Sequence, residues 1–271
     1  MGHHHDTVSF LSDYGLDDEF VGVVRSVIRS LAPHATVVDI THGVPPHDVR
    51  AGALALVRSV QYLAPGVVLA VVDPGVGTNR RAVAVQAGQD GEAVFVGPDN
   101  GLLASAVAMV GGATAAVELT NPTYHLPAPG PTFAGRDVFA PVVAHLCNGV
   151  DLAELGEPID PIGLRPGVLP LTRREGDRLV AEVLWVDRFG NVQLNVDPDE
   201  IAALGERLAL RWGGDQVRTA RRARAYDDLG PGEVGLVVDS YGMVSVALAR
   251  RSAGEELRLR PGDAVSLEEP S

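Results

Sequence analysis

Residues 7–150 alternate short apolar runs with segments whose apolar side chains recur at helical spacing. This alternation is typical of a mainly parallel sheet flanked by helices. It predicts strands at Val8–Leu11, Thr36–Ile40, Val67–Val72, Ala82–Val85 and Ala93–Val96, and helices at Glu19–Leu31, Val49–Tyr62, Leu102–Val110 and Val138–Cys147. A turn at Gln89-Asp90-Gly91 predicts a hairpin between the last two strands, so part of the sheet is expected to be antiparallel.

The pattern changes after two proline-rich segments, 127–131 and 158–170, to short strands separated by glycine turns. The strands predicted there are Leu179–Val186, Val192–Val196, Leu208–Trp212, Gly235–Val238 and Val244–Leu248. The sequence therefore predicts two domains, an α/β domain over residues 1–170 and a smaller all-β, barrel-like domain over residues 171–271.

Composition narrows the classes of partner. Hydrophobic residues make up 46% of the 271 residues, but no uncharged apolar run approaches the roughly 20 residues that a membrane helix needs. The net charge of −13 argues against binding to nucleic acid or anionic membranes. Arg218, Arg221, Arg222 and Arg224 form a basic cluster that we interpret as a solvated strand face. With Cys147 as the only cysteine, no internal disulfide is expected, and a cytoplasmic location fits.

One apolar run ends in a group of polar residues that suits ligand binding. The run from Gly66 to Val72 leads directly into Asp73, then into a glycine-rich turn, and Arg80 follows. The glycines of this turn let the backbone come close to a ligand, and Arg80 is expected to fold back toward Asp73. An ordinary turn followed by a surface arginine explains this segment alone equally well.

In an open α/β sheet, ligands bind beyond the carboxyl ends of the strands. The residues after the other predicted strands are also polar, as in Ser12-Asp13-Tyr14-Gly15, Thr41-His42-Gly43 and Pro98-Asp99-Asn100-Gly101. Asp13 is the best candidate to accept both hydroxyls of a ribose. The alternatives are structural, since Asp17 and Asp18 would cap the next helix, and His42 and His47 would be loop residues.

The standard motifs of other chemistries are absent from the sequence. It has no phosphate loop, no nucleophile elbow and no His-Glu-x-x-His zinc motif. Gly75 and Gly77 lack the third glycine of a dinucleotide-binding turn, and the histidines do not follow metal-ligand spacing. No metal or cofactor is therefore expected, and a direct displacement assisted by polarised side chains is the chemistry that fits.

Six segments, in the same order and spread over nearly the whole chain, resemble the S-adenosyl-L-methionine (SAM) hydroxide adenosyltransferases, which are relatives of the fluorinases and chlorinases. They are Phe10-Leu-Ser-Asp-Tyr-Gly15, Val38-Asp-Ile-Thr-His42, Val72-Asp-Pro-Gly-Val-Gly-Thr-Asn-Arg80, Gly97-Pro-Asp-Asn-Gly101, Thr132-Phe-Ala-Gly-Arg-Asp137 and Asp187-Arg-Phe-Gly-Asn191. Any one of these motifs is weak evidence, whereas six in order are specific.

The resemblance implies hydrolysis of SAM to adenosine and L-methionine, by attack of water or hydroxide on the ribose C5′. The sulfonium leaves as a neutral thioether, so the site mainly has to place and activate the nucleophile. In the family an Asp, an Arg and a His do this, and Asp73 and Arg80 match the first two. Ala134 stands at the His position, so we expect binding to be retained and turnover to be weakened. The substitution is either engineered or a natural variant that works without the imidazole.

The resemblance also implies substrate contacts in both domains. The implied binding residues are Asp13 for the ribose, Asp18, Asp187 and Ser240 for the methionine group, Phe189, Asn191 and Tyr226 for the adenine, together with Phe133 and Gly135. Structural alternatives stay open, because Phe189 and Tyr226 would serve equally as core residues and Asn191 as a turn former. A homotrimer is implied as well, with the ligand held between the N-terminal domain of one subunit and the C-terminal domain of the next.

Two other activities stay open at this point. Halogenating relatives carry Tyr in place of Asp73, and a carboxylate there would repel a halide by roughly several kcal/mol, which favours hydroxide. Gly135 nevertheless resembles the chlorinases at a halide-contact position, so a chlorinase-like halogenase is the first alternative. Ala134 motivates the second, a SAM- or adenosine-binding protein without turnover.

Overall fold

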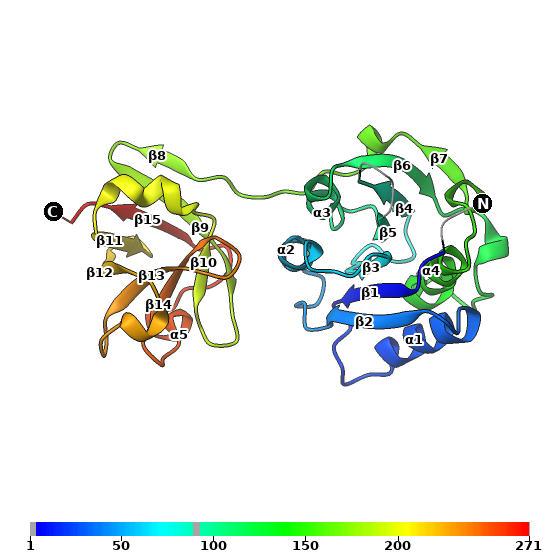
Figure 1. The fold of residues 1–271 in the computed structure, drawn as a ribbon, viewed down its shortest axis with the longest axis horizontal. Helices are drawn as coiled ribbons and strands as arrows, with labels where there is room; N and C mark the ends of the chain where they lie inside the picture. The colour runs from blue at the N-terminus through cyan, green and yellow to red at the C-terminus, as the bar shows by residue number, and fades with distance from the viewer. Residues whose placement is uncertain (1–3, 89–92, 271) are drawn as a thin grey trace. The chain divides into compact units, whose positions relative to one another are not determined.

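The computed structural model describes residues 4–88 and 93–270 of the chain. The chain divides into two compact units, Met1–Val168 and Leu169–Ser271, which are described separately (Figure 1). Among the described residues, the helices are too short or too polar to cross a membrane.

The N-terminal unit is built on a seven-stranded sheet of order β2-β1-β3-β5-β4-β6-β7. Its strands are β1 (Thr7–Ser12), β2 (Thr36–Thr41), β3 (Val67–Val71), β4 (Ala82–Ala87), β5 (Ala93–Pro98), β6 (Ala113–Glu118) and β7 (Glu157–Ile159). β2, β1, β3 and β5 are parallel, and β6 runs the same way because it is antiparallel to β4, which is antiparallel to β5. The predicted mainly parallel sheet with an antiparallel part is confirmed.

Helices cover both faces of this sheet (Figure 1). They are α1 (Phe20–Leu31), α2 (Val49–Val60), α3 (Ala104–Met109) and α4 (Ala140–Cys147). α1 and α4 pack their apolar sides on one face, and α2 and α3 pack theirs on the other. All five residues of β3 are buried, because its side chains point alternately into these two cores. β3 is therefore a strand covered on both faces, as its uninterrupted apolar run predicts.

The elements of the N-terminal unit differ from the predicted ones at several points, and one predicted turn is not covered by the described residues. β6 and β7 were not predicted. The helix expected from Val138 starts earlier, with a π-helical turn at Gly135–Phe139 that leads into α4. The N-cap of α1 is Glu19, with no side-chain hydrogen bond, so the hypothesis that Asp17 and Asp18 cap this helix is wrong. The predicted hairpin turn lies outside the described residues, although β4 and β5 do pair antiparallel.

Short helical turns complete the connections of both units. They are η1 (Pro122–Tyr124), η2 (the π-helical turn Gly135–Phe139), η3 (Leu152–Glu154), η4 (Pro161–Gly163), η5 (Pro198–Leu204) and η6 (Tyr226–Asp228). Aspartates begin several of them, because a carboxylate accepts the free backbone N–H groups of a first turn. These turns position loops and add little to the core.

The C-terminal unit is a barrel. Its elements are β8 (Arg173–Glu175), β9 (Arg178–Val186), β10 (Val192–Leu194), β11 (Arg207–Trp212), β12 (Gln216–Ala223), β13 (Val234–Val238), β14 (Val244–Leu248), α5 (Ala253–Leu257) and β15 (Ala264–Glu268). The sheet runs β10-β14-β13-β12-β11-β15-β9-β8, and pairing of β10 with β9 closes seven strands while β8 extends the edge. The predicted all-β, barrel-like domain is confirmed, with β8, β12, β15 and α5 in addition to the predicted elements.

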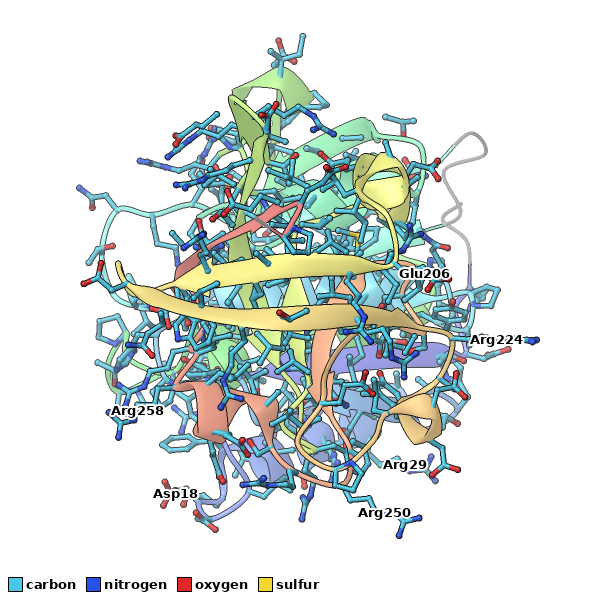
Figure 2. All side chains as sticks on the ribbon, turned by 90° about the vertical axis from the view of Figure 1, so that its left-hand side faces the viewer. Asp18, Arg29, Glu206, Arg224, Arg250 and Arg258 are labelled. Atoms are coloured by element: carbon cyan, nitrogen blue, oxygen red, sulfur yellow. The ribbon has the colours of Figure 1, made fainter. Side chains whose placement is uncertain are left out.

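The basic cluster of this unit lies on and just after β12. Nε of Arg221 donates to Glu233 at 2.7 Å, and the Arg218 and Arg224 side chains are exposed. Figure 2 shows Arg224 projecting outward from the surface. The contacts support a solvated strand face, in which one arginine is neutralised locally.

Candidate active site

Asp73 and Arg80 form a buried ion pair just beyond the carboxyl end of β3. Nε of Arg80 donates to Oδ1 of Asp73 at 2.7 Å, and Nη2 donates to Oδ2. The Asp73 side chain is 5% exposed and the Arg80 side chain 15% exposed. A bidentate pair of this kind fixes both the position and the orientation of the carboxylate. Arg80 thus folds back onto Asp73, as the sequence predicts.

The turn between these residues is shaped so that Arg80 can fold back. The hydroxyl of Thr78 donates to the carbonyl of Gly75 at 2.7 Å, and Gly77 has φ +77°, which favours glycine. A Cβ on Gly75 would come within 3.1 Å of Cγ of Arg80, so the lack of a side chain at Gly75 leaves room for the Arg80 side chain to fold back. The guanidinium then lies 5.4 Å from the ring centre of Phe139, in the π-helical turn.

Asn100 anchors the end of the same strand from a neighbouring loop. Its Nδ2 donates to the carbonyl of Val72 at 2.9 Å, and its Oδ1 accepts from the N–H of Leu102. Val72 directly precedes Asp73, so Asn100 holds the backbone that carries the carboxylate. Asn100 was not among the predicted site residues, although its turn motif was recognised.

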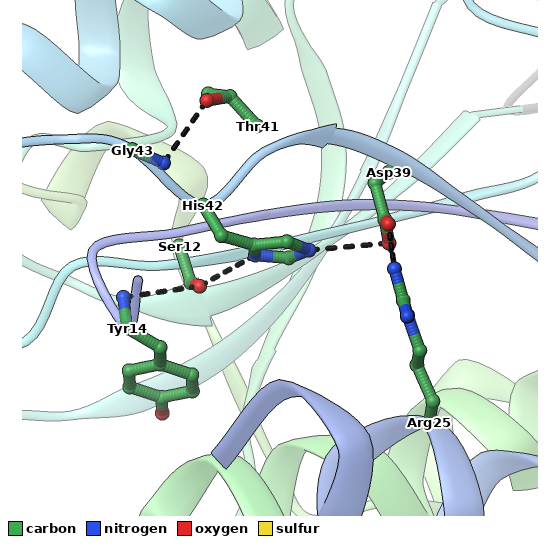
Figure 3. Close-up of polar contacts among 7 residues, drawn as sticks. All are labelled: Ser12, Tyr14, Arg25, Asp39, Thr41, His42 and Gly43. Carbon is green, nitrogen blue, oxygen red and sulfur yellow. Dashed lines mark hydrogen bonds and ion pairs between the residues drawn. The ribbon is translucent and has the colours of Figure 1, made fainter. Parts of the chain in front are cut away.

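A polar chain, buried at Ser12 and His42 and open to solvent at Asp39, holds the carboxyl ends of β1 and β2 (Figure 3). Oγ of Ser12 lies 2.7 Å from Nδ1 of His42, and Nε2 of His42 lies 3.1 Å from Oδ1 of Asp39. Asp39 also accepts from Nε of Arg25 at 3.1 Å, and the N–H of Tyr14 donates to Ser12 Oγ at 3.3 Å. The chain thereby fixes the loop that begins at Asp13.

The neutral form of His42 fits this chain. With its proton on Nε2, Nδ1 accepts from the Ser12 hydroxyl, while Nε2 lies close to Asp39 without an aligned hydrogen bond. Burial, followed by the charge of Arg25, lowers the pKa of His42 to about 4. Ser12 is 0% exposed and faces Nδ1 instead of Nε2, so these residues do not form a nucleophilic Ser-His-Asp triad. His42 therefore has a structural role, which is the alternative that the sequence analysis gave for it.

Asp13 and Tyr14 follow β1 at the same edge of the sheet. Oδ2 of Asp13 accepts from the N–H of His47 at 2.9 Å, and His47 has the unusual φ of +68°. Oδ1 of Asp13 has no hydrogen-bond partner among the described residues, which leaves one carboxylate oxygen for a ligand. The ring of Tyr14 packs edge-on against Phe133, with 5.8 Å between centroids.

The segment Phe133 to Gly135 closes this side of the site. Phe133 also stacks edge-on with Phe20, and Gly135 starts the π-helical turn, an irregularity that is frequent at functional sites. A side chain on Gly135 would come within 2.2 Å of the Tyr14 hydroxyl. The close approach of Tyr14 therefore explains why residue 135 is a glycine, and a halide-binding role is not needed to explain it. Ala134 is half-buried between Phe133 and Gly135 and adds only a methyl group.

Three predicted or motif residues serve other purposes or stand apart. The Asp99 carboxylate accepts from Nε of Arg81 at 2.9 Å and from the N–H of Arg165 at 2.7 Å, so it is committed to the scaffold. Asp137 is likewise engaged by its neighbour Arg136, at 2.6 Å. Asp18 is exposed and projects from the surface (Figure 2).

In the C-terminal unit, Asp187 organises the loop that carries Phe189 and Asn191. Its Oδ1 accepts from the N–H groups of both residues at 2.8 Å, and its Oδ2 accepts from Nδ2 of Asn191 at 2.8 Å. Phe189 is 79% exposed, so it is not a core residue. The loop thus presents an aromatic ring and the Asn191 oxygen on a pre-formed turn.

Asp239 plays a similar part beside Ser240 and was not predicted from the sequence. Its Oδ2 accepts from Gln193 at 2.7 Å and from Ser245 at 2.9 Å, and its Oδ1 accepts from the N–H of Tyr241. Burial, then Asp239, then Asp187 raise the pKa of Tyr226, which places this ring near both carboxylates. Asp187, Tyr226 and the Asp239 turn with Ser240 therefore cluster in the barrel.

Two residue sets therefore emerge, one in each unit. The N-terminal set joins Asp13, Asp73, Arg80, Phe133, Ala134 and Gly135, and adds Tyr14 and Asn100 to the prediction. Over residues 4–88 and 93–270, no three His, Cys, Asp or Glu side chains are grouped as metal ligands. The N-terminal set offers a carboxylate that Arg80 holds in place and several aromatic rings, which suits the orientation of a water molecule.

Comparisons with known proteins agree with the motifs. The N-terminal domain model of the SAM hydroxide adenosyltransferases matches residues 8–156, and the C-terminal domain model of the same family matches residues 181–266. An (R)-S-adenosyl-L-methionine hydrolase of Salinispora arenicola is 47% identical over 256 residues, which cover 94% of this chain and 95% of the relative. A fluorinase of Actinoplanes sp. is more distant, at 29% identity over 91% of each chain.

A solved structure shares the fold of the whole chain. The crystal structure of a conserved protein from Thermotoga maritima superposes with a TM-score of 0.87 at 33% identity, covering 97% of this chain and 100% of that protein. Both domain models, the hydrolase relative and this structure span the two units in order. The chain therefore belongs to the SAM hydroxide adenosyltransferase family.

Proposed function

We propose that this chain is a hydrolase that converts SAM to adenosine and L-methionine. The observation that carries the proposal is the buried bidentate pair of Asp73 and Arg80 at the carboxyl end of β3. The name of the Salinispora relative, an (R)-S-adenosyl-L-methionine hydrolase, supports the substrate and the reaction. SAM is then the substrate, and the reaction needs no further cofactor.

The reaction exchanges one bond at C5′ for another. A water oxygen forms the C5′–O bond while the C5′–S bond breaks, and its electron pair stays on sulfur as neutral methionine. The proton that the water loses passes to the Asp73 carboxylate and from there to solvent. Because Arg80 holds both carboxylate oxygens in place, the main contribution of Asp73 is to align the attacking water.

The same pair favours water over halide. Arg80 offsets much of the charge of Asp73, so simple repulsion of a halide is weaker than a lone carboxylate would produce. The carboxylate oxygens are nevertheless hydrogen-bond acceptors. They bind the O–H groups of water, but they cannot form a hydrogen bond with a chloride ion, which has no hydrogen to donate. Gly135, the feature that favoured a chlorinase, has its own steric explanation in the Tyr14 hydroxyl.

We assign the remaining contacts by the motifs and by the two residue sets. Asp13 binds the ribose, with Phe133 and Gly135 lining the reaction side. Asp18, Asp187 and Ser240 bind the methionine group, and Phe189, Asn191 and Tyr226 bind the adenine. These C-terminal residues complete the site in a homotrimer, whose mass light scattering after gel filtration would measure. A cytoplasmic location, and the absence of nucleic-acid partners, stay predictions from composition.

Product analysis tests the proposed function. The chain is incubated with each sulfonium epimer of SAM, with and without chloride, and the products are separated by chromatography with mass detection. Adenosine and methionine from the (R) epimer, unaffected by chloride, are expected. A 5′-chloro-5′-deoxyadenosine product would support the halogenase alternative, and SAM binding without any product would support the non-catalytic one.

A further inference from the structure

Tyr14 and Asp73 occupy equivalent places at the ends of two neighbouring parallel strands. Ser12 of β1 pairs with Val71 of β3, and Tyr14 and Asp73 each lie two positions further along the chain. The N–H of Asp13 continues the pairing by donating to the carbonyl of Val71 at 3.3 Å. Tyr14 and Asp73 therefore share the sheet edge at which α/β folds bind their ligands.

The phenol ring of Tyr14 is held on several sides. Its centroid lies 6.5 Å from that of Phe10, 5.7 Å from that of Phe20 and 5.8 Å from that of Phe133, and the contacts with Phe10 and Phe133 are edge-on. Aromatic contacts of this kind fix a ring in one orientation. The backbone is held as well, because the N–H of Tyr14 donates to the buried Ser12 hydroxyl (Figure 3). The position of the hydroxyl is thus set before any ligand binds.

The hydroxyl points at the segment that contains Ala134. A Cβ on Gly135 would lie 2.2 Å from it, so the oxygen sits directly against the Gly135 backbone. Within residues 4–88 and 93–270, the hydrogen bond that Tyr14 makes uses its backbone N–H, and the hydroxyl has no protein partner. Tyr14 is half-buried, so its hydroxyl is free to bind a water or a ligand group.

The charges around the hydroxyl keep it protonated. Burial raises the pKa of Tyr14 most, the nearby Asp13 and Asp73 carboxylates raise it further, and Arg80 lowers it. The phenol is therefore neutral throughout the physiological range, and a neutral phenol both donates and accepts a hydrogen bond. The same interactions place it within electrostatic reach of the Asp73–Arg80 pair.

We propose that the Tyr14 hydroxyl is a catalytic residue of the hydrolysis, which binds the attacking water together with Asp73 on the side where Ala134 offers only a methyl group. The inference rests on the proposed function. One O–H of the water donates to Asp73 and the other donates to the Tyr14 oxygen, which leaves a lone pair directed at C5′. Tyr14 keeps its own proton throughout, and the proton that the water loses leaves through Asp73.

Replacement of the hydroxyl alone tests this role. Tyr14→Phe keeps the packed ring, and Tyr62→Phe, on a residue 75% exposed, is the matched control. For Tyr14→Phe we expect a roughly tenfold fall in kcat, the loss expected for one well-placed hydrogen bond, with KM, the Kd for SAM and the melting temperature nearly unchanged. A kcat within twofold of the parent chain, with SAM binding intact, would overturn the proposal.

A double-mutant cycle with Ala134→His distinguishes a catalytic from a structural role of Tyr14. If Tyr14 were only structural, the kcat loss caused by Tyr14→Phe would be the same with Ala134 and with His at 134. An imidazole at 134 would bind the same water, so the loss caused by Tyr14→Phe is expected to shrink to less than threefold in the Ala134→His background. The pH dependence of kcat from pH 7 to 10 is expected to keep its shape in Tyr14→Phe, because the phenol stays neutral there. An additive cycle would mean that Tyr14 acts apart from this water and would contradict the proposal.

The experiments distinguish failure of the proposed function from failure of the role proposed for Tyr14. If the parent chain forms no adenosine from either epimer of SAM, the proposed function is wrong, and the role of Tyr14 falls with it. If the parent chain forms adenosine and Tyr14→Phe forms it equally fast, only the inference about Tyr14 is wrong.

Discussion

The Arg80 guanidinium donates two hydrogen bonds to the Asp73 carboxylate, with Nε on Oδ1 at 2.7 Å and Nη2 on Oδ2. This arrangement makes the carboxylate a hydrogen-bond acceptor of fixed position and orientation. A site of this kind accelerates a displacement by alignment more than by proton transfer. The leaving group is a neutral thioether, so the site has no need of a strong general acid.

Removal of the Asp73 charge is expected to lower turnover strongly while substrate still binds. Asp73→Asn keeps the size of the side chain but replaces one acceptor oxygen with a donor, so the water is no longer aligned. We expect kcat to fall by about a hundredfold or more, with the Kd for SAM changed less than fivefold. Steady-state kinetics and calorimetry measure the two quantities.

The control for this variant is a comparable ion pair in the C-terminal unit. Nε of Arg221 donates to Glu233 at 2.7 Å, and Glu233→Gln removes that charge. Its kcat is expected to match that of the parent chain. Asp73→Asn and Glu233→Gln enzymes with equal kcat would show that the Asp73 pair is only structural.

An imidazole at position 134 is expected to raise turnover. Ala134→His would restore the proton-accepting group that the family resemblance implies at this position, and such a group typically contributes about a hundredfold in rate. SAM binding should change little, because we expect the chain with Ala134 to bind SAM already. Equal values of kcat for Ala134→His and the parent chain, measured side by side, would contradict the idea that Ala134 limits this site.

The fit between Gly135 and Tyr14 predicts a destabilising substitution with a specific suppressor. Gly135→Ala would place a Cβ 2.2 Å from the Tyr14 hydroxyl, and we expect the free energy of unfolding to fall by about 1–3 kcal/mol, as in other overpacked sites. Adding Tyr14→Phe removes the closest atom of the clash and should restore part of the loss. Urea unfolding of the three variants measures this, and no recovery in the double variant would argue against the clash.

The depressed pKa of His42 predicts a stability that falls with acidity. The unfolded chain binds a proton near the ordinary value of 6.5, whereas the folded chain binds it only near 4. Between these values the unfolded state holds more protons, so the free energy of unfolding declines as pH falls, by at most about 1.4 kcal/mol per pH unit from this group. Above 6.5 its contribution is constant.

Urea unfolding at several pH values separates this effect from other groups. His42→Gln is expected to show a shallower decline than the parent chain between pH 6.5 and 4. His47→Gln, on an exposed loop residue, should show the decline of the parent chain. Parallel curves for His42→Gln and the parent chain would mean that His42 titrates normally.

Much of the scaffold could be predicted because its signals are local. The run Gly66 to Val72 is uninterrupted and apolar, so β3 and the place of Asp73 after it followed directly from the sequence. β6 was missed because its Ala-rich sequence has weak strand propensity, and β12 because arginines interrupt its apolar pattern. In both, pairing with neighbouring strands decides the conformation.

The site was predictable only where the chain itself brings residues together. Asp73 and Arg80 share one turn, so their pairing could be expected from the sequence. The contact of Tyr14 with Gly135 joins residues far apart in the chain, and the link from Ser12 through His42 to Asp39 depends on the pairing of β1 with β2. A sequence without a structure carries no signal for either relationship.

The most direct test of the central claim is hydrolysis of SAM in water enriched in oxygen-18. Attack of water on C5′ places the solvent oxygen in the 5′-hydroxyl of adenosine, which mass spectrometry of the isolated adenosine detects. The account predicts one labelled oxygen per adenosine, with methionine unlabelled. Adenosine without the label, or a halogenated nucleoside in its place when chloride is present, would contradict the claim that Asp73 and Arg80 direct water to this carbon.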